Sequence, residues 1–262
     1  MTLVGAGGQT RLELRQTMRI PPELEGAALH EMFGSALRSI STQSTDVTVS
    51  LANRLFVFQN MNIRDEFSHM LSKDYSAEAE SLVNYADLEA KRQRINQWVS
   101  ETTNSRIPEL FAQGALNVNS LLTLVNTVYL KDTMGAILMR SFVSEEVDLE
   151  LPRFRLSESP PLNMKLLLQS MGVRSMFDKT ADLSNLSPDA NIYVSDLVHK
   201  AVIMVDEQGA EAAAGSGIEI SPTSIPDTME FHVDHPFLTA LVYRSTIPAF
   251  IGHVFDPEVM WS

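Results

Sequence analysis

The sequence contains no cysteine among its 262 residues. Disulfide bonds, thiolate metal sites and a cysteine nucleophile are therefore excluded, although this absence does not identify a cellular compartment. The sequence also has no apolar run long enough to span a bilayer, and its first residues lack the basic start and sustained apolar stretch of a signal peptide. As written, the sequence predicts neither a membrane span nor an export signal.

Basic residues are scarce as well. The chain has 20 Lys and Arg residues against 33 Asp and Glu residues, so its formal net charge is -13. An acidic chain is repelled by phosphate backbones and anionic lipid, so we expect neither nucleic acid nor a membrane as a partner. The chain is long enough, and at 44% hydrophobic residues apolar enough, to bury a sizeable core in one or two domains.

Motifs for nucleotide binding and catalysis are missing too. The glycines at positions 5, 7 and 8 would need a further glycine at Thr10 and a full strand before them to bind a dinucleotide, and neither is present. No Ser, His and Asp residues stand out as a catalytic set. We therefore expect that the protein is not an enzyme and that it needs no cofactor.

The spacing of apolar residues predicts several helices and strands. Helical spacing is found in residues 29–40, 63–71 and 88–102, with Asp87 as an N-cap of the third helix and Lys91, Arg92 and Arg94 as solvated charges on its outer side. Pro160 and Pro161 open a further helix whose buried face would hold Leu162, Leu166, Leu167 and Met171. Strands are predicted at residues 47–58, 121–130, 147–154, 201–205, 237–243 and 247–255. This mixture predicts an α+β fold.

The segment that follows strand 201–205 suits both a loop and a strand. Read with period two, Ala210, Ala212, Ala214, Ser216, Ile218 and Ile220 form one small, uncharged face. The Gly, Ser and Pro content of the same segment suits an exposed loop, which suggests a change between the two states. A helix of alanines that runs into a flexible linker fits the pattern equally well.

Three stretches carry a resemblance to the serpin family. Residues 207–226 resemble the hinge and reactive loop of a serpin, and FHVDHPF resembles the strand after that loop. The block ANRLF…INQWVSETTNSRIPEL…LVNTVYLK resembles the serpin sequence from the second strand of the main sheet, through the helix that crosses it, to the third strand. The resemblance implies a single domain over residues 1–262, with helices packed on a large central mixed β-sheet and an exposed reactive loop.

Two pieces of the family pattern are absent from the chain. These are the first helix with the start of the next one, and an internal block near residues 132–138 that supplies most strands of the two smaller sheets. The two C-terminal strands should consequently lose neighbours on their apolar faces, which is an aggregation hazard.

The resemblance also implies a function and its residues. A serpin inhibits a serine protease as a suicide substrate, and family spacing places the cleaved bond at about Thr223–Ser224, which suits an elastase-like pocket. The implied hinge residues are Glu207, Gly209, Ala210, Glu211, Ala212, Ala213 and Ala214. Asn126 and His199 match polar residues that help the sheet to open, although the family's serine partners lie in the absent N-terminal helix.

Other interpretations follow from the same residues. His232, Asp234 and His235 resemble a metal site, but the family's strand pattern explains them better, so no metal is expected. His199 also fits a histidine of the core that only forms hydrogen bonds with its neighbours and has no functional role. The family implies an inhibitor that limits proteolysis in the extracellular space, with the cytoplasm as the alternative. A binding protein that keeps the loop only as a protease substrate is the alternative function.

Overall fold

The computed structural model describes residues 1–40, 47–133, 147–150, 152–157, 160–206, 229–243 and 247–255. The described residues belong to two compact units, one within Met1–Ser41, Ser50–Val128 and Glu158–Ala201, the other within Thr42–Val49, Tyr129–Ser157 and Val202–Ser262. The helices are α1 (Thr2–Gly5), α2 (Gly8–Thr17), α3 (Gly26–Ile40), α4 (Asp65–Tyr75), α5 (Leu88–Thr102), α7 (Met164–Ser170) and the 3-10 helix η1 (Ser175–Phe177). The strands are β1 (Val47–Val57), β2 (Glu78–Ser81), β3 (Leu122–Thr133), β4 (Val147–Glu150), β5 (Phe154–Ser157), β6 (Leu162–Asn163), β7 (Val194–Asp206), β8 (Met229–His232), β9 (Phe237–Tyr243) and β10 (Ile247–Val254).

A mixed sheet is the main feature of the fold. Its strand order is β2-β1-β3-β7-β5, and β6 also pairs with β7. β1 and β2 are parallel, whereas β5 and β6 both run antiparallel to β7. Together with the helices this confirms the predicted α+β fold with a large mixed sheet.

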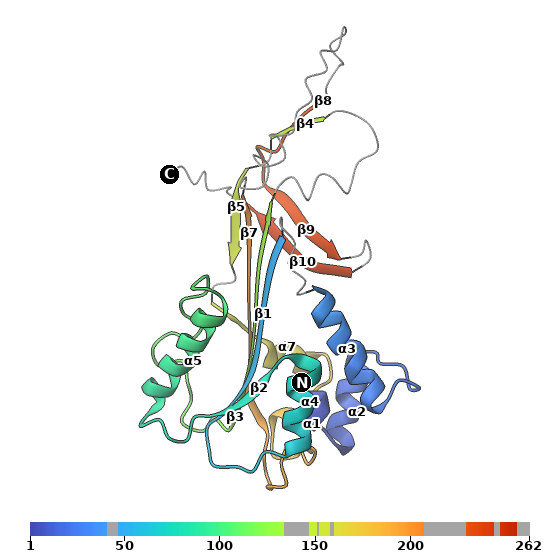
Figure 1. Ribbon diagram of the computed structural model, residues 1–262, viewed down its shortest axis with the longest axis vertical. Helices are drawn as coiled ribbons and strands as arrows, with labels where there is room; N and C mark the ends of the chain where they lie inside the picture. Colours follow the sequence, from blue (N-terminus) through green and yellow to red (C-terminus); the bar gives the residue numbers. More distant parts are fainter. Residues whose placement is uncertain are drawn as a thin grey trace. The chain divides into compact units, whose positions relative to one another are not determined.

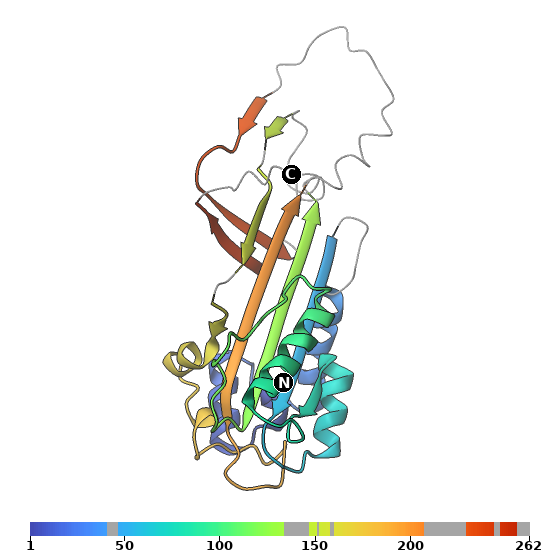
Figure 2. The same ribbon diagram turned by 90° about the vertical axis from the view of Figure 1, so that its left-hand side faces the viewer.

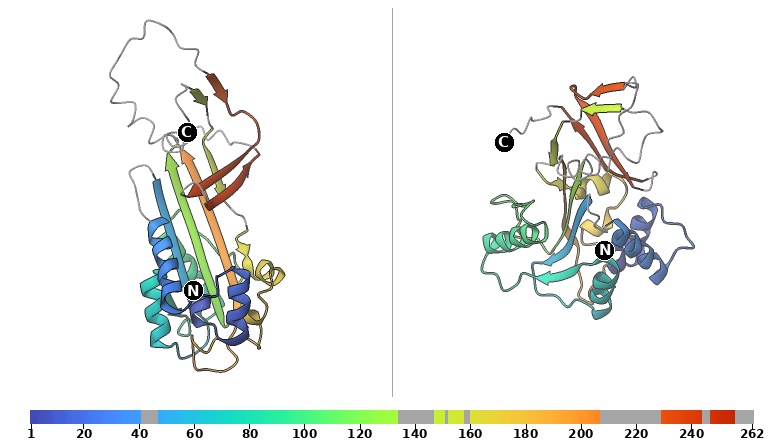
Figure 3. Two further views of the ribbon diagram at one scale, coloured as in Figure 1. Left: turned by 90° about the vertical axis from the view of Figure 1, so that its right-hand side faces the viewer. Right: turned by 45° about the horizontal axis from the view of Figure 1, so that its top comes forward.

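In the first unit, helices cover both faces of the sheet. α5 lies on one face, and α1 to α4 lie on the opposite side (Figures 1, 2 and 3). Alternating residues of β1 meet these two layers because successive strand side chains point to opposite faces. Phe56 contacts Trp98 of α5 edge to face with ring centroids 5.5 Å apart, while Leu55 and Val57 belong to the core beneath α1 to α4.

That core holds most of the large buried side chains of the first unit. Leu14, Leu29, Phe67, Leu71 and Met176 are at most 6% exposed and come from three helices and η1. Each such side chain contributes about 1.5–3 kcal/mol when it is fully removed from water. The core therefore anchors the central strands from one side.

α3 and α4 pack closely against each other at this core. A Cβ atom at Gly34 would lie 2.5 Å from the carbonyl oxygen of Asp74, so only glycine allows this approach. Nearby, His30 Nδ1 and the Tyr75 hydroxyl are 2.8 Å apart and buried. Burial lowers the pKa of His30 and raises the pKa of Tyr75 to about 12, so both groups are neutral at pH 7.

In the second unit, β9 and β10 form an antiparallel pair and β4 pairs in parallel with β8. One face of the β9–β10 pair packs on β5, since Phe237 contacts Phe154 edge to face with ring centroids 5.5 Å apart and Gly252 faces Leu156. The other face is open: Leu238 and Ile251 are each 69% exposed, and Phe255, just after β10, is 75% exposed. The expectation of an uncovered apolar face on these strands is confirmed.

The prediction that the helix after Pro160 buries Leu162, Leu166, Leu167 and Met171 is wrong. Leu162, Leu166, Leu167 and Met171 are 43%, 73%, 46% and 55% exposed. Leu162 and Asn163 pair with β7 as β6, so the helix begins only at Met164. Apolar spacing shows which residues share a face but not which face meets the protein, and here Leu168 is the one that packs on the core.

Candidate functional site

The predicted reactive bond and hinge lie outside the described residues. This applies to Thr223 and Ser224 and to the hinge residues Glu207, Gly209, Ala210, Glu211, Ala212, Ala213 and Ala214. The two elements that flank this stretch are described, because β7 ends at Asp206 and β8 begins at Met229. The candidate site is therefore built from β7 and its neighbour β3.

β3 and β7 are hydrogen-bonded neighbours in the sheet. Their arrows point the same way in Figure 2, so the two strands are parallel. The other edge of β7 is occupied by β5, with Phe154 opposite Val205 and Ser157 opposite Val202. The pairing with β3, the β3–β7 boundary, consequently occupies the edge of β7 opposite to β5.

The two residues predicted to assist sheet opening meet across this boundary. His199 Nδ1 of β7 lies 2.5 Å from Asn126 Oδ1 of β3. An amide oxygen can only accept, so His199 Nδ1 carries the proton and donates it. The structure therefore brings Asn126 and His199 together, while their role in sheet opening stays a prediction.

Asn53 of β1 is a third member of this polar cluster. Asn126 Nδ2 donates to Asn53 Oδ1 at 2.6 Å, so a chain of two hydrogen bonds connects β1, β3 and β7. Sequence reasoning missed Asn53. Its side chain points to the same face of β1 as those of the core residues Leu55 and Val57, because these three residues are two positions apart along the strand. A polar residue at such a position was the signal, because a buried amide must find partners.

A further side chain crosses the β3–β7 boundary near the start of β7. The Ser195 hydroxyl accepts a hydrogen bond from the backbone N–H of Leu121 at 2.8 Å. Lys165 Nζ of α7 donates to the carbonyl oxygen of Ser195 at 3.1 Å. The beginning of β7 is thus held both by the segment before β3 and by α7.

An ion-pair network connects α5 to strands β1 and β2 of the sheet. Glu80 of β2 accepts from Arg54 Nη1 of β1 at 2.5 Å and from Arg94 Nε of α5 at 2.6 Å. Arg54 also lies over the ring of Trp98, 4.8 Å from its centroid. The prediction of Arg94 as a solvated charge is wrong, because its side chain is only 22% exposed and its partner comes from another element.

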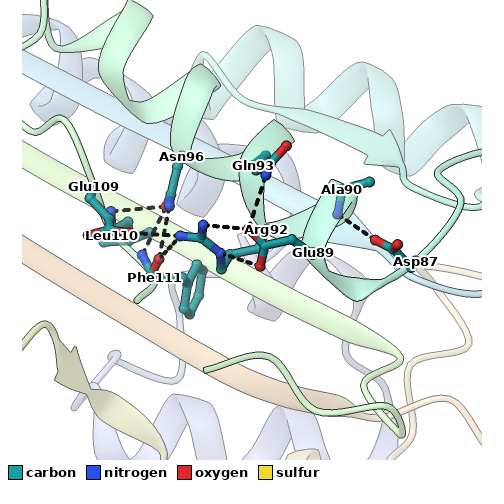
Figure 4. A network of polar contacts seen from close by, with 9 residues as sticks. All are labelled: Asp87, Glu89, Ala90, Arg92, Gln93, Asn96, Glu109, Leu110 and Phe111. Carbon is teal, nitrogen blue, oxygen red and sulfur yellow. Dashed lines mark hydrogen bonds and ion pairs between the residues drawn. The ribbon is translucent and has the colours of Figure 1, made fainter. Parts of the chain in front are cut away.

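The segment after α5 is tied back to the same helix, as Figure 4 shows. Asn96 Oδ1 accepts from the N–H groups of Leu110 and Phe111 at 3.0 and 2.9 Å. Arg92 donates to Glu109 and to the carbonyl oxygen of Phe111, both at 2.7 Å. Arg92 is 13% exposed in this network, so it is not a solvated charge either, and Lys91 likewise donates to the carbonyl oxygen of Phe58 at 3.1 Å.

Two hydroxyl groups of β3 are buried without a partner among the described residues. Thr123 and Thr127 are both 0% exposed, and the Oγ1 atom of each makes no hydrogen bond. Thr123 and Thr127 are three residues and one residue away from Asn126, so their side chains point to the opposite face of β3. That face is the one that α5 covers. An unpaired buried hydroxyl costs about 1–3 kcal/mol, so β3 carries a local source of instability.

Thr127→Val should therefore stabilise the protein by about 1–2 kcal/mol, because valine keeps the shape of threonine and removes the unpaired hydroxyl. The measurement is the free energy of unfolding in urea. Thr10→Val is the matched control, since Thr10 is also 0% exposed but its hydroxyl lies 2.9 Å from Ser175 Oγ and accepts from the N–H of Asp182 at 3.0 Å. That control should be destabilised, and a loss of stability in Thr127→Val as well would show that its hydroxyl has a partner.

The described residues contain no group of three or more His, Cys, Asp or Glu placed to hold a metal ion. Of the histidine-rich turn, Asp234 and His235 contact each other and are both exposed. Within the same described ranges, none of the helices has the length and apolar character to cross a membrane.

Comparison with known proteins gives one consistent result. The family model described as "Serpin (serine protease inhibitor)" matches residues 1–136 and 135–257. Human serpin B12 is 28% identical over 312 aligned residues, which cover 86% of this chain and 76% of the relative. Leukocyte elastase inhibitor of Bos taurus is 26% identical over 343 aligned residues, which cover 98% of this chain and 89% of the relative.

A solved structure agrees at the level of the fold. The crystal structure of Manduca sexta serpin-12 superimposes with a TM-score of 0.76 at 22% identity, covering 98% of this chain and 88% of that chain. The alignment with the bovine inhibitor is longer than the 262 residues of this sequence. The bovine inhibitor therefore has internal residues with no counterpart here.

Proposed function

Because the chain belongs to the serpin family of serine protease inhibitors, we propose that it traps a serine protease as a suicide substrate. The protease serine attacks the carbonyl carbon of Thr223, the bond to Ser224 breaks, and Thr223 becomes the acyl group of an acyl-enzyme. The cut loop then enters the main sheet as a new strand and carries the attached protease with it. Distortion of the protease active site prevents hydrolysis of the ester.

The arrangement of β7 is the observation that carries this proposal. The loop continues directly from the end of β7, and a chain that turns back there runs antiparallel to β7. One edge of β7 already pairs with β5, so the returning strand must enter at the β3–β7 boundary. An inserted strand would be antiparallel to both neighbours, since β3 and β7 point the same way (Figure 2).

This geometry also supplies a driving force. Insertion replaces one parallel pairing by two antiparallel pairings, and antiparallel pairing is slightly more stable per residue. β3 has 12 residues and β7 has 13, so a strand formed by the loop would find partners along most of its length. The released energy grows with every residue of the loop that is inserted.

In this proposal the polar cluster and the hinge have distinct roles. The His199–Asn126 hydrogen bond crosses the boundary that must open, so it holds the closed sheet and breaks before insertion. The hinge residues Glu207, Gly209, Ala210, Glu211, Ala212, Ala213 and Ala214 enter first. Their small side chains on one face suit a strand that is buried as it forms.

The identity of the bond suggests the type of target. Thr223 is small and β-branched, which favours an elastase-like pocket over a trypsin-like pocket that needs Lys or Arg. The similarity to the bovine leukocyte elastase inhibitor, at 26% identity, supports the same class of protease. The family has extracellular and intracellular members, and placement in the extracellular space stays a prediction.

The uncovered apolar face of β9 and β10 favours a second candidate function. Leu238 and Ile251 are exposed among the described residues, and such exposure leaves fewer contacts with which to hold a strained native state. It would then be a binding protein whose loop is only a protease substrate. In both cases we propose one domain over residues 1–262 with an internal deletion near 132–138, which agrees with the change of matched segment at residues 135–136.

A denaturing gel separates the two functions. The purified chain is mixed with elastase-, chymotrypsin- and trypsin-like proteases, and the inhibitor predicts an SDS-stable band at the summed mass with the elastase-like enzyme. Catalytic-serine-to-alanine protease is the control, because it cannot form the ester and should give no such band. Cleavage near Thr223 with fully active protease would reject inhibition and favour the substrate-only protein.

A further inference from the structure

An apolar cavity of about 210 Å³ lies in the first unit, on the side of β7 that faces the helices. Its floor is formed by Val173 and Met176, which are both 0% exposed, and Leu197 of β7 is part of its wall. Leu168 of α7 is half-buried at its border, and Met18 at the end of α2 is 47% exposed. The cavity therefore has a closed apolar floor and a rim that reaches solvent.

Among the residues that the structure describes, none with a charged side chain lines this cavity. The Thr17 hydroxyl donates to the carbonyl oxygen of Met171 at 3.2 Å, and the Tyr75 hydroxyl is paired with His30 at 2.8 Å. The Thr2 hydroxyl also belongs to the lining. These hydroxyls carry no charge, and those of Thr17 and Tyr75 already have partners within the protein.

The volume suits a small organic molecule. An apolar protein cavity of about 150 Å³ is large enough to stay dry and to bind benzene. The lining is mainly apolar, so water in the cavity would find few polar partners. We propose that the cavity is a binding site for a small, uncharged apolar ligand of the size of a substituted benzene.

The position of the cavity suggests what such a ligand would control. Leu197 is two residues before His199 on the same strand, so both side chains point to the same side of the sheet. A ligand against Leu197 would stabilise β7 in the position in which His199 meets Asn126. This step rests on the proposed function: occupancy should slow loop insertion and hence covalent capture of the protease.

Binding is tested first on the protein alone, with hexafluorobenzene as the probe and ¹⁹F NMR as the readout. Leu168→Trp should fill the border of the cavity and weaken binding at least tenfold. Leu166→Trp is the matched control, since it lies on the same helix, is 73% exposed and does not line the cavity. Equal binding by the two variants, or no binding by the unmodified protein, would overturn the proposal.

Two further measurements keep the test decisive if Leu168→Trp does not fold. The charged analogue pentafluorobenzoate should not bind, because none of the described lining residues has a cationic side chain. With ¹³C-methyl methionine labelling, hexafluorobenzene should shift the methyl signals of Met18 and Met176 but not that of Met171, which is exposed and outside the lining. Binding of pentafluorobenzoate, or a shift at Met171 alone, would place the probe on the exposed apolar surface of α7 instead.

The control over inhibition is measured separately. At a probe concentration ten times its dissociation constant, the rate of covalent capture should fall by up to about tenfold if the opened sheet no longer binds the probe. An unchanged capture rate with confirmed binding would reject the coupling and leave the binding site intact. Absence of any covalent complex would reject the proposed function without affecting the NMR result.

Discussion

Ala210→Arg should convert the protein from an inhibitor into an ordinary substrate of its target protease. Insertion would bury the new guanidinium in the main sheet, and an unpaired buried charge costs several kcal/mol. Insertion would slow by about a hundredfold or more, because each 1.36 kcal/mol changes a rate tenfold. Hydrolysis of the acyl-enzyme would then outrun insertion. SDS-stable complex and rate of loop cleavage are measured on the same samples.

The neighbouring residue offers a matched control. Glu211→Arg adds the same side chain one position later, on the alternate face that carries Glu211 and Glu219 and tolerates charge. This variant should retain most of its covalent complex. Equal loss in both variants would indicate that any change near the hinge is harmful, and full complex formation by Ala210→Arg would exclude strand insertion as the mechanism.

Cleavage of the reactive loop should raise the thermal transition temperature by about 20–40 °C. An inserted strand of similar length to β3 forms roughly ten more ladder hydrogen bonds than the parallel pairing it replaces, at a net value of about 1 kcal/mol each. For a chain of this size, 1 kcal/mol corresponds to about 2–4 °C. The measurement is circular dichroism during heating, before and after limited cleavage by an elastase-like protease.

The control for this experiment is the hinge variant. Cleaved Ala210→Arg should melt within a few degrees of its uncleaved form, because its loop cannot enter the sheet. Thr127→Val should raise the transition of the uncleaved protein, because it removes an unpaired buried hydroxyl. An unchanged transition after cleavage of the unmodified chain would show that the loop does not insert.

The elements that the sequence predicted best are those with strong periodic patterns. The strand predicted at residues 47–58 is β1, and the strand predicted at 121–130 is β3. Asp87 caps α5 as expected, since its side chain accepts from the N–H of Ala90 at 2.8 Å. Local signals of this kind depend on neighbours within a few residues, which the sequence displays directly.

Contacts between distant residues could not be predicted in the same way. Arg94 finds Glu80 on β2, and Arg54 joins the same carboxylate from β1, so the pattern along α5 alone shows neither partner. The exposed surface of α7 has a similar origin, because burial depends on which elements pack against a helix. Asn126 and His199 were predicted only through the family resemblance, and Asn53 was missed.

The hydrogen bond between His199 and Asn126 gives the molecule a built-in spectroscopic reporter. We expect the proton held on His199 Nδ1 by the amide oxygen to exchange slowly with water and to give a separate imidazole N–H signal in the proton NMR spectrum. The sequence has only six histidines, so this signal can be assigned by a single substitution. Its disappearance, followed in real time after protease is added, would time the opening of the sheet without any attached label.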